Sequence, residues 1–149
     1  SSLCSETISW YYYEYGVSIS NQYLPWLTYN FKNIESHADM HDQFKYAGRL
    51  YCYHAGYKEW IKKDISYNWV LSDSYHPQAG DFLDRRDSDG DSSNGDDGHA
   101  MMLMDWDENT GIAQTLDGPW NINFRPVNVE SSEVSGSRDY CVGRIPAND

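Results

Sequence analysis

The sequence of 149 residues has few basic side chains and no long apolar run. Only 11 Lys and Arg stand against 23 Asp and Glu, which gives a formal net charge of −12. A field of that sign repels phosphate backbones, so we do not expect nucleic acid as a partner. No stretch approaches the roughly 18 uninterrupted apolar residues that a spanning helix needs, so we do not expect membrane insertion.

Cysteine is also scarce, with Cys4, Cys52 and Cys141 alone. An odd count in an exported protein indicates one disulfide and one free thiol. Cys52 and Cys141 each lie in an aromatic-rich, core-like segment, which makes them the natural pair and leaves Cys4 free. Spacing alone does not fix a pairing, and in a reducing cytosol all three would be thiols. We expect a secreted or exported protein, and the opening on Ser1 leaves room for a removed leader or upstream domain.

Aromatic residues are abundant, with 13 Tyr and six Trp among side chains that are 40% hydrophobic. That apolar volume suits one domain spanning residues 1–149. Tyr and Trp combine an apolar body with a polar tip, so they suit grooves for peptide or carbohydrate as well as cores. For any single aromatic residue, the core is the commoner place.

The order of the secondary-structure patterns predicts an α+β domain. Helical spacing of apolar residues predicts a helix over residues 4–16, and further helical patches over 31–50 and 54–64. Turn residues and short alternating runs then dominate, with a hairpin over 99–118 and a last strand over 139–145. Helices first and antiparallel strands afterwards are typical of that class.

Cys4 and His99 are the candidate nucleophile and base. Cys4 lies in the first turn of the predicted helix, where unpaired N–H groups and a partial positive charge favour a thiolate and suit an oxyanion. A catalytic thiol also needs an imidazole within hydrogen-bond reach. Among five histidines, His99 opens a strand directly after Gly98, which gives its side chain a defined face.

Asp117 is the candidate third residue. With the hairpin turn centred on Asn109 or on Glu108, Asp117 shares the face of His99 as a diagonal or direct neighbour. A slip by one residue sends Asp117 to the other face and leaves Gln114 beside His99. Singly, each candidate has a commoner explanation, as a buried thiol, a surface imidazole and a turn aspartate. Their joint order predicts a Cys–His–Asp site.

The run CSETISWYYYEYGV resembles the nucleophile helix of bacterial cell-wall cysteine peptidases and amidases, the NlpC-type and CHAP families. PQAGDFLDRR and GHAMMLMDWDENTGIAQTLDGPW are similar to their PGD strand and to the strand that carries the base, and YCVGRI is similar to their last strand. The resemblance covers both ends of the chain, and residues 18–68 match no motif. It implies a papain-like fold, with N-terminal helices packed on a C-terminal antiparallel sheet.

The same resemblance implies that Cys4 is the nucleophile, His99 the base and Asp117 a third polar residue. The expected activity is cleavage of an amide bond in peptidoglycan or another peptide substrate, with no cofactor required. Two features differ from the family. Only three residues precede Cys4, where relatives carry an oxyanion or substrate contact, and the acidic run before His99 is longer and would suit a lid.

That acidic run offers oxygen atoms at spacings suited to a hard cation such as calcium. The candidate ligands are Asp87, Asp89, Asp91 and Asn94, with Asp96 beyond them. The run falls short of an EF-hand loop, because Ser92 replaces the turn glycine and Gly98 replaces the final glutamate. A solvated charge run is the interpretation that we favour, and a calcium site is the alternative.

Two other functions are compatible with the sequence. An acyl or isopeptide transferase could use the same thiol and imidazole with an amine acceptor in place of water. A non-catalytic module could bind glycan through its aromatic residues, or calcium through the acidic run, with Cys4 merely structural. Fast alkylation of Cys4 near neutral pH would favour an enzyme over such a module.

Overall fold

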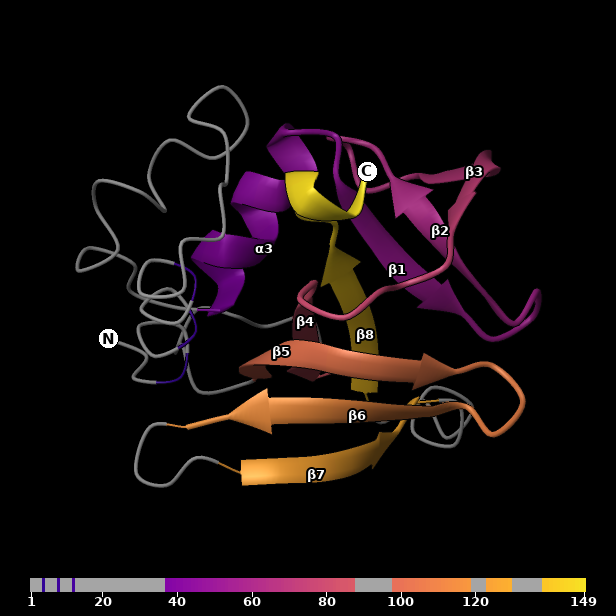
Figure 1. Ribbon diagram of the computed structural model, residues 1–149. Coiled ribbons are helices and arrows are strands. Elements are labelled where there is room, and N and C mark those ends of the chain that lie inside the picture. Colours follow the sequence, from indigo (N-terminus) through magenta and orange to yellow (C-terminus); the bar gives the residue numbers. More distant parts are fainter. Residues whose placement is uncertain are drawn as a thin grey trace.

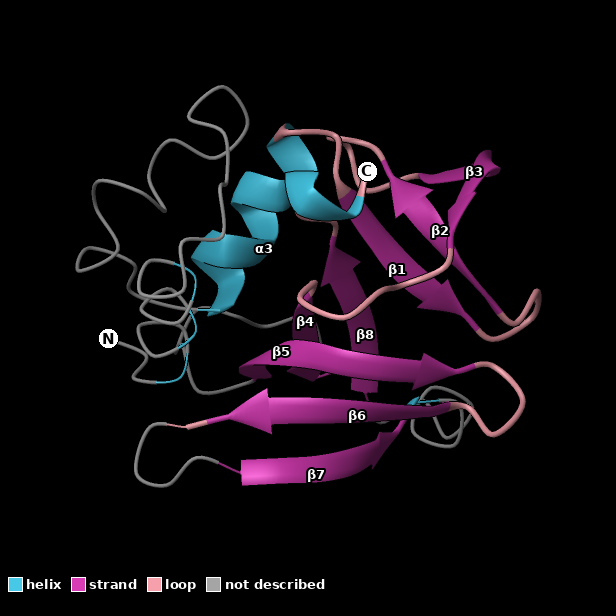
Figure 2. Cartoon of the chain, viewed as in Figure 1, coloured by secondary structure: helices cyan, strands magenta, loops and turns pink. Residues whose placement is uncertain are grey.

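The computed structural model describes Cys4, Ile8 and Tyr12 together with residues 37–87, 98–118, 123–129 and 138–149. Eight strands form one antiparallel sheet on which helix α3 (His37–Tyr46) packs, with a short 3-10 helix η2 (Pro146–Asn148) at the C-terminus (Figures 1 and 2). The strands are β1 (Leu50–His54), β2 (Glu59–Lys63), β3 (Trp69–Tyr75), β4 (Phe82–Asp87), β5 (Gly98–Asp107), β6 (Ile112–Asp117), β7 (Asn123–Asn128) and β8 (Arg138–Gly143).

The sheet consists of two meanders joined by the last strand. Its order is β3-β2-β1-β8-β4-β5-β6-β7, so β8 lies between the meander β1–β3 and the meander β4–β7. Cys52 of β1 pairs directly with Cys141 of β8, and the two form the predicted disulfide. That prediction is confirmed. The disulfide therefore crosslinks the two meanders at the place where they meet.

Both faces of the central strands are buried, because apolar residues occupy successive positions. Leu50 and Cys52 belong to a core cluster beneath α3, whereas Tyr51 and Tyr53 belong to a second cluster on the opposite face. The sheet curls so that β1–β2 and β5–β6 face one another (Figure 1). Between them, the ring of Trp106 lies 5.3 Å from that of Trp60 and 5.6 Å from that of Tyr53, so aromatic packing closes the curl.

Helix α3 presents one apolar stripe to the sheet. Met40 and Phe44 are four residues apart and fully buried, and the ring of Phe44 stacks on that of Phe82 with centroids 5.2 Å apart. A Cβ on Gly143 would lie 2.4 Å from the Phe44 ring, so glycine is needed at that position of β8. The helix ends at Tyr46, and Gly48 in the turn that follows has a φ of +74°, the left-handed conformation that favours glycine.

The prediction of a papain-like α+β fold, with N-terminal helices packed on a C-terminal sheet, is wrong. In the described part of the chain the protein is β-rich, with an eight-stranded antiparallel sheet and the short helix α3, the one α-helix described along its whole length. The error comes mainly from residues 50–75, which supply three strands that the helical spacing did not indicate.

Particular elements show which patterns misled and which did not. The helical patch expected over 54–64 is a turn followed by β2, because Trp60 and Ile61 are both buried and face opposite sides of the sheet. Lys58, with φ of 54°, makes the turn that precedes the strand. Helix α3 lies within the other expected patch, and β5, β6 and β8 confirm the predicted hairpin and last strand.

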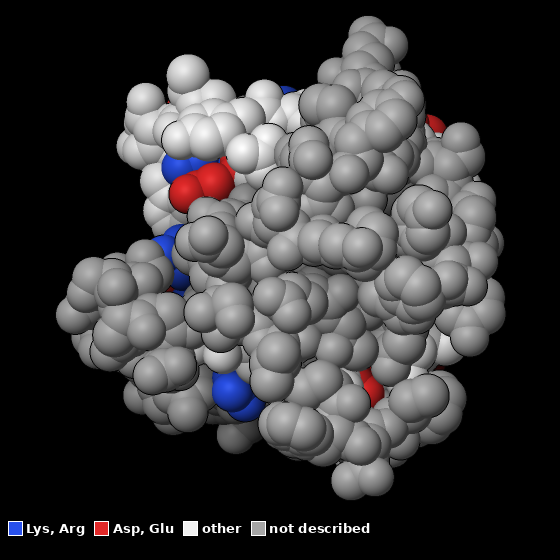
Figure 3. All heavy atoms as spheres, turned by 90° about the vertical axis from the view of Figure 1, so that its left-hand side faces the viewer, with Lys and Arg blue, Asp and Glu red and all other residues white. Residues whose placement is uncertain are grey.

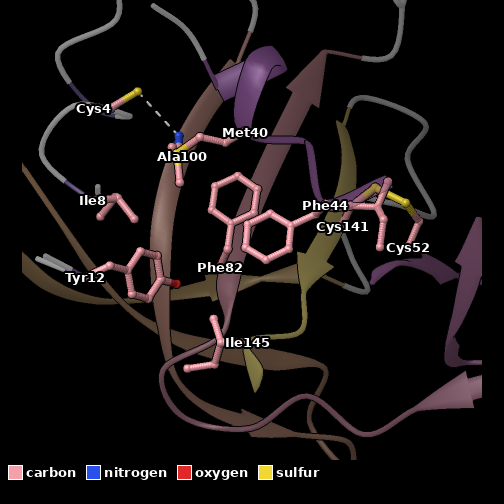
Figure 4. Close-up of a cluster of buried hydrophobic side chains, with 11 residues drawn as sticks. Cys4, Ile8, Tyr12, Met40, Phe44, Cys52, Phe82, Ala100, Cys141 and Ile145 are labelled. Carbon is pink, nitrogen blue, oxygen red and sulfur yellow. Dashed lines mark hydrogen bonds between the residues drawn. A yellow bond between two sulfur atoms is a disulfide. The ribbon is translucent and has the colours of Figure 1, made fainter. Parts of the chain in front are cut away.

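Three residues of the first segment are described, and each is helical and buried. Cys4, Ile8 and Tyr12 recur every four residues and lie against the cluster beneath α3 (Figure 4). The hydroxyl of Tyr12 donates a hydrogen bond of 2.8 Å to the carbonyl of Gly80. The other residues of the helix predicted over 4–16 lie outside the described residues.

Candidate active site

The free thiol is held against strand β5. Cys4 is the free cysteine of the described residues and is 8% exposed. The backbone N–H of Ala100 donates a hydrogen bond of 3.4 Å to its sulfur, drawn as a dashed line in Figure 4. A donor at that distance stabilises negative charge on sulfur, so the contact favours the thiolate.

His99 lies one residue before Ala100, near the start of β5, and joins two partners. Its Nε2 is 2.7 Å from Oδ2 of Asp117, and its imidazole is also hydrogen-bonded to Cys4. The structure therefore brings the three predicted site residues together in the order thiol, imidazole, carboxylate.

The surroundings of His99 act on its pKa in opposite directions. Burial lowers the pKa, because a charged imidazolium loses solvation. Hydrogen bonds and electrostatic attraction to Cys4 and Asp117 outweigh burial, so the pKa is raised above its ordinary value. His99 is 16% exposed and Asp117 only 2%, so the imidazole keeps a limited path to solvent while the carboxylate does not.

A bulge in the hairpin decides where Asp117 points. Asp105 pairs with Gln114, but Leu103 pairs with Thr115, so Met104 is an extra residue on β5. Such a bulge shifts the register by one residue and re-aims every side chain beyond it.

Without the extra residue Met104, the register of the turn would continue and place Asp117 opposite Met102, on the face away from His99. With it, the observed register places Asp117 beside Met101, two residues from His99 and therefore on the same face. Near the site, the two strands adopt the predicted register in which Asp117 is a diagonal neighbour of His99. The predicted alternative, a slip by one residue that would leave Gln114 beside His99, is not observed there.

A second buried histidine–aspartate pair, which the sequence did not indicate, lies one strand away. Nδ1 of His41 in α3 is 2.8 Å from Oδ2 of Asp84 in β4, and Asp84 pairs across the sheet with Ala100. Arg86 donates to Nε2 of His41 at 3.2 Å. Because a guanidinium can only donate, Nε2 of His41 accepts from Arg86 and Nδ1 donates to Asp84.

No motif joins His41 to Asp84, because the two residues are 43 positions apart. The available signal was the aspartate in FLDRR, a charged residue within an apolar strand start that needs a buried partner. A prediction of that kind would have required knowing that α3 covers β4.

The candidate calcium ligands fall almost entirely outside the described residues. Asp89, Asp91, Asn94 and Asp96 are not described, and only the backbone of Asp87, at the end of β4, is. Among the described residues, no group of three or more His, Cys, Asp or Glu side chains is arranged to hold a metal ion.

Comparisons of the chain with family models, with curated proteins and with solved structures found no match. In the described ranges, no helix is both long and apolar enough to cross a membrane. The described charged side chains visible in Figure 3 form separate spots of both signs.

Proposed function

We propose that this protein is a cysteine hydrolase that cleaves an amide bond, with Cys4 as nucleophile and His99 as base. The supporting observation is that one imidazole is hydrogen-bonded both to the free thiol and to a buried carboxylate. Asp117 acts through His99 as a positioning residue, because it fixes the ring and stabilises its charged form.

The chemistry follows from this arrangement. His99 takes the proton of Cys4, and the thiolate attacks the carbonyl carbon of the substrate to form a tetrahedral intermediate. The carbon–nitrogen bond then breaks as His99 returns the proton to the leaving amine, which leaves a thioester on Cys4. His99 next removes a proton from water, the resulting hydroxide attacks the thioester, and the acid is released with the thiol restored.

Two features support a reactive thiol. The raised pKa of His99 favours transfer of the thiol proton to the ring. The Ala100 N–H stabilises the sulfur anion without a second titratable group. The unpaired N–H groups that the sequence places in the first turn after Cys4, and that suit an oxyanion, lie outside the described residues.

The proposed substrate is a peptide bond or sugar–peptide bond of peptidoglycan. This choice rests on the resemblance of the Cys4 run and the His99 strand to cell-wall cysteine peptidases and amidases. The Cys52–Cys141 disulfide supports an exported location, where such bonds persist and where peptidoglycan is found.

Digestion of purified peptidoglycan tests the proposal. The wild-type protein should release soluble fragments with new amino and carboxyl termini, detected by mass spectrometry, and Cys4→Ala at equal concentration should release none. Products joined to an added amine would instead identify a transferase. Equal release by the two proteins would contradict the assignment of Cys4.

A further inference from the structure

Arg85 in β4 lies beside His99 on the same face of the sheet. The two residues pair directly across β4 and β5, and side chains of directly opposed residues share a face, with Cβ atoms about 4.5–5.5 Å apart. Leu83 and Met101, the next residues along that face of each strand, both belong to the core cluster on the side away from α3. A positively charged side chain therefore stands next to the candidate base.

The guanidinium of Arg85 has no hydrogen-bond, ion-pair or ring partner among the described residues. Other arginines of the described part are paired. Arg49 and Arg144 both lie against the carboxylate of Asp149. Arg86, the next residue along β4, donates to a histidine nitrogen at 3.2 Å. Arg85 therefore differs from its neighbours in having no acceptor of its own.

The outer end of the Arg85 side chain is open to solvent. Its Nε is buried without an acceptor, but the residue as a whole is only partly buried. The two terminal nitrogens, Nη1 and Nη2, are not buried, so four N–H donors remain accessible. A guanidinium that is partly withdrawn from water and has no counter-charge is costly, so an anion that binds its terminal nitrogens would be stabilised.

A carboxylate is the anion that suits this position. The planar guanidinium binds a carboxylate through two parallel N–H···O bonds. Phosphate also matches that geometry, but a phosphate monoester carries close to two negative charges and a carboxylate carries one. The net charge of −12 therefore disfavours phosphate more strongly. In so acidic a protein, a carboxylate near the thiol needs a local cation.

We propose that Arg85 is a specificity-determining residue that binds a free carboxylate of the substrate, close to the amide bond that Cys4 attacks. The inference rests on the proposed function, because it takes His99 as the base of that reaction. The substrate class that Arg85 selects is an acidic peptide, and the stem peptides of peptidoglycan belong to this class because they carry free carboxylates. Arg85 does not touch the reacting atoms, so its loss should raise KM more than it lowers kcat.

Calorimetry on the full chain carrying Cys4→Ala tests the binding step, because no cleavage can occur. The probes are the peptide L-alanyl-γ-D-glutamyl-L-lysyl-D-alanine and the same peptide with both free carboxylates amidated. We expect a Kd about tenfold lower for the acidic peptide, because amidation removes a hydrogen bond between two charged groups. Adding Arg85→Gln should remove that difference. Adding Arg85→Lys should keep part of it, because lysine retains the charge without the planar fork.

Lys58→Gln is the matched control, because it removes the same charge from the turn between β1 and β2, far from the start of β5 (Figure 1). It should keep the preference for the acidic peptide, and thermal melting checks that each variant is folded. Binding of neither peptide in the millimolar range, equal Kd values in the Cys4→Ala parent, or a preference that survives in folded Arg85→Gln would overturn the inference.

The outcomes separate the role of Arg85 from the proposed reaction. Cleavage of peptidoglycan by the wild type, with no preference for the acidic peptide in binding, would contradict only the role of Arg85. A preference that depends on Arg85, with no cleavage by the wild type, would contradict only the proposed hydrolase.

Discussion

Two histidine–aspartate pairs with nearly the same geometry lie one strand apart in this protein. The nitrogen–oxygen distance is 2.8 Å between His41 and Asp84, and 2.7 Å between His99 and Asp117. They differ in burial, since the side chains of the first pair are 1% and 0% exposed whereas His99 is 16% exposed. They also differ in what the second ring nitrogen meets.

The third partner separates a structural pair from a candidate catalytic one. Arg86 can only donate and does not release a proton, so it fixes the ring of His41 in one orientation. Cys4 can release a proton, and its attraction for the imidazolium contributes to the raised pKa of His99. In both pairs the carboxylate orients the imidazole ring. The group at the second ring position, Arg86 or Cys4, determines whether the ring can exchange a proton with it.

The largest effect on turnover should come from removing the thiol of Cys4, the partner of His99 at the candidate site. Cys4→Ala deletes the attacking atom, so kcat for peptidoglycan cleavage should fall by about 10⁴-fold or more, as loss of a nucleophile does in other hydrolases. Release of soluble fragments measures the rate, and thermal melting checks that the variant is folded. If folded Cys4→Ala protein kept wild-type turnover, the His99–Asp117 pair would have only a structural role, like the His41–Asp84 pair.

Breaking the other pair should act on stability instead. Asp84→Ala leaves the buried His41 without its hydrogen-bond partner, and we expect a loss of about 1–3 kcal/mol in the free energy of unfolding. Urea denaturation measures the loss. Turnover per folded molecule should stay within a few-fold of the wild type. A large loss of turnover with unchanged stability would contradict the structural role of the His41–Asp84 pair, because Asp84 would then belong to the active site.

Asp117→Asn keeps the shape of the third group and removes its charge. The imidazolium of His99 loses its stabilising partner, and kcat should fall by roughly 100-fold, at the low end of what a positioned acid–base group contributes. Because Asp117 raises the pKa of His99, the pH–rate profile should also move to lower pH in the variant. An unchanged profile would mean that Asp117 only packs.

The smallest effect is on the pH dependence of stability. The pKa of His99 is raised in the folded protein, so the charged ring stabilises the fold. That contribution is complete below the unfolded value of about 6.5 and disappears as the pH rises through the higher folded value. The melting temperature of wild type minus that of His99→Gln should therefore be largest in acid and shrink towards alkaline pH. A difference that grows with pH would contradict the sign of the shift.

Local patterns predicted which residues lie together better than they predicted the fold. The start of the strand at Gly98–His99, the hairpin and the disulfide partners were each predicted from a few neighbouring residues, and tertiary packing did not override these local preferences. Residues 50–75 misled because Trp60 and Ile61 are buried on opposite faces of the sheet, and a short apolar run buried on both sides lacks the alternation that marks a strand. The face of Asp117 depended on a one-residue bulge at Met104, which sequence spacing does not reveal.

The alkylation rate of Cys4 tests the central claim most directly, because the other two cysteines form the disulfide and Cys4 is the one free thiol of the sequence. Iodoacetamide labelling followed by mass spectrometry gives the rate in wild type and in His99→Gln at matched pH. Below the ordinary thiol pKa of about 8.5, wild-type Cys4 should react at least roughly tenfold faster than the variant. Equal rates across that range would show that the imidazole does not activate the sulfur.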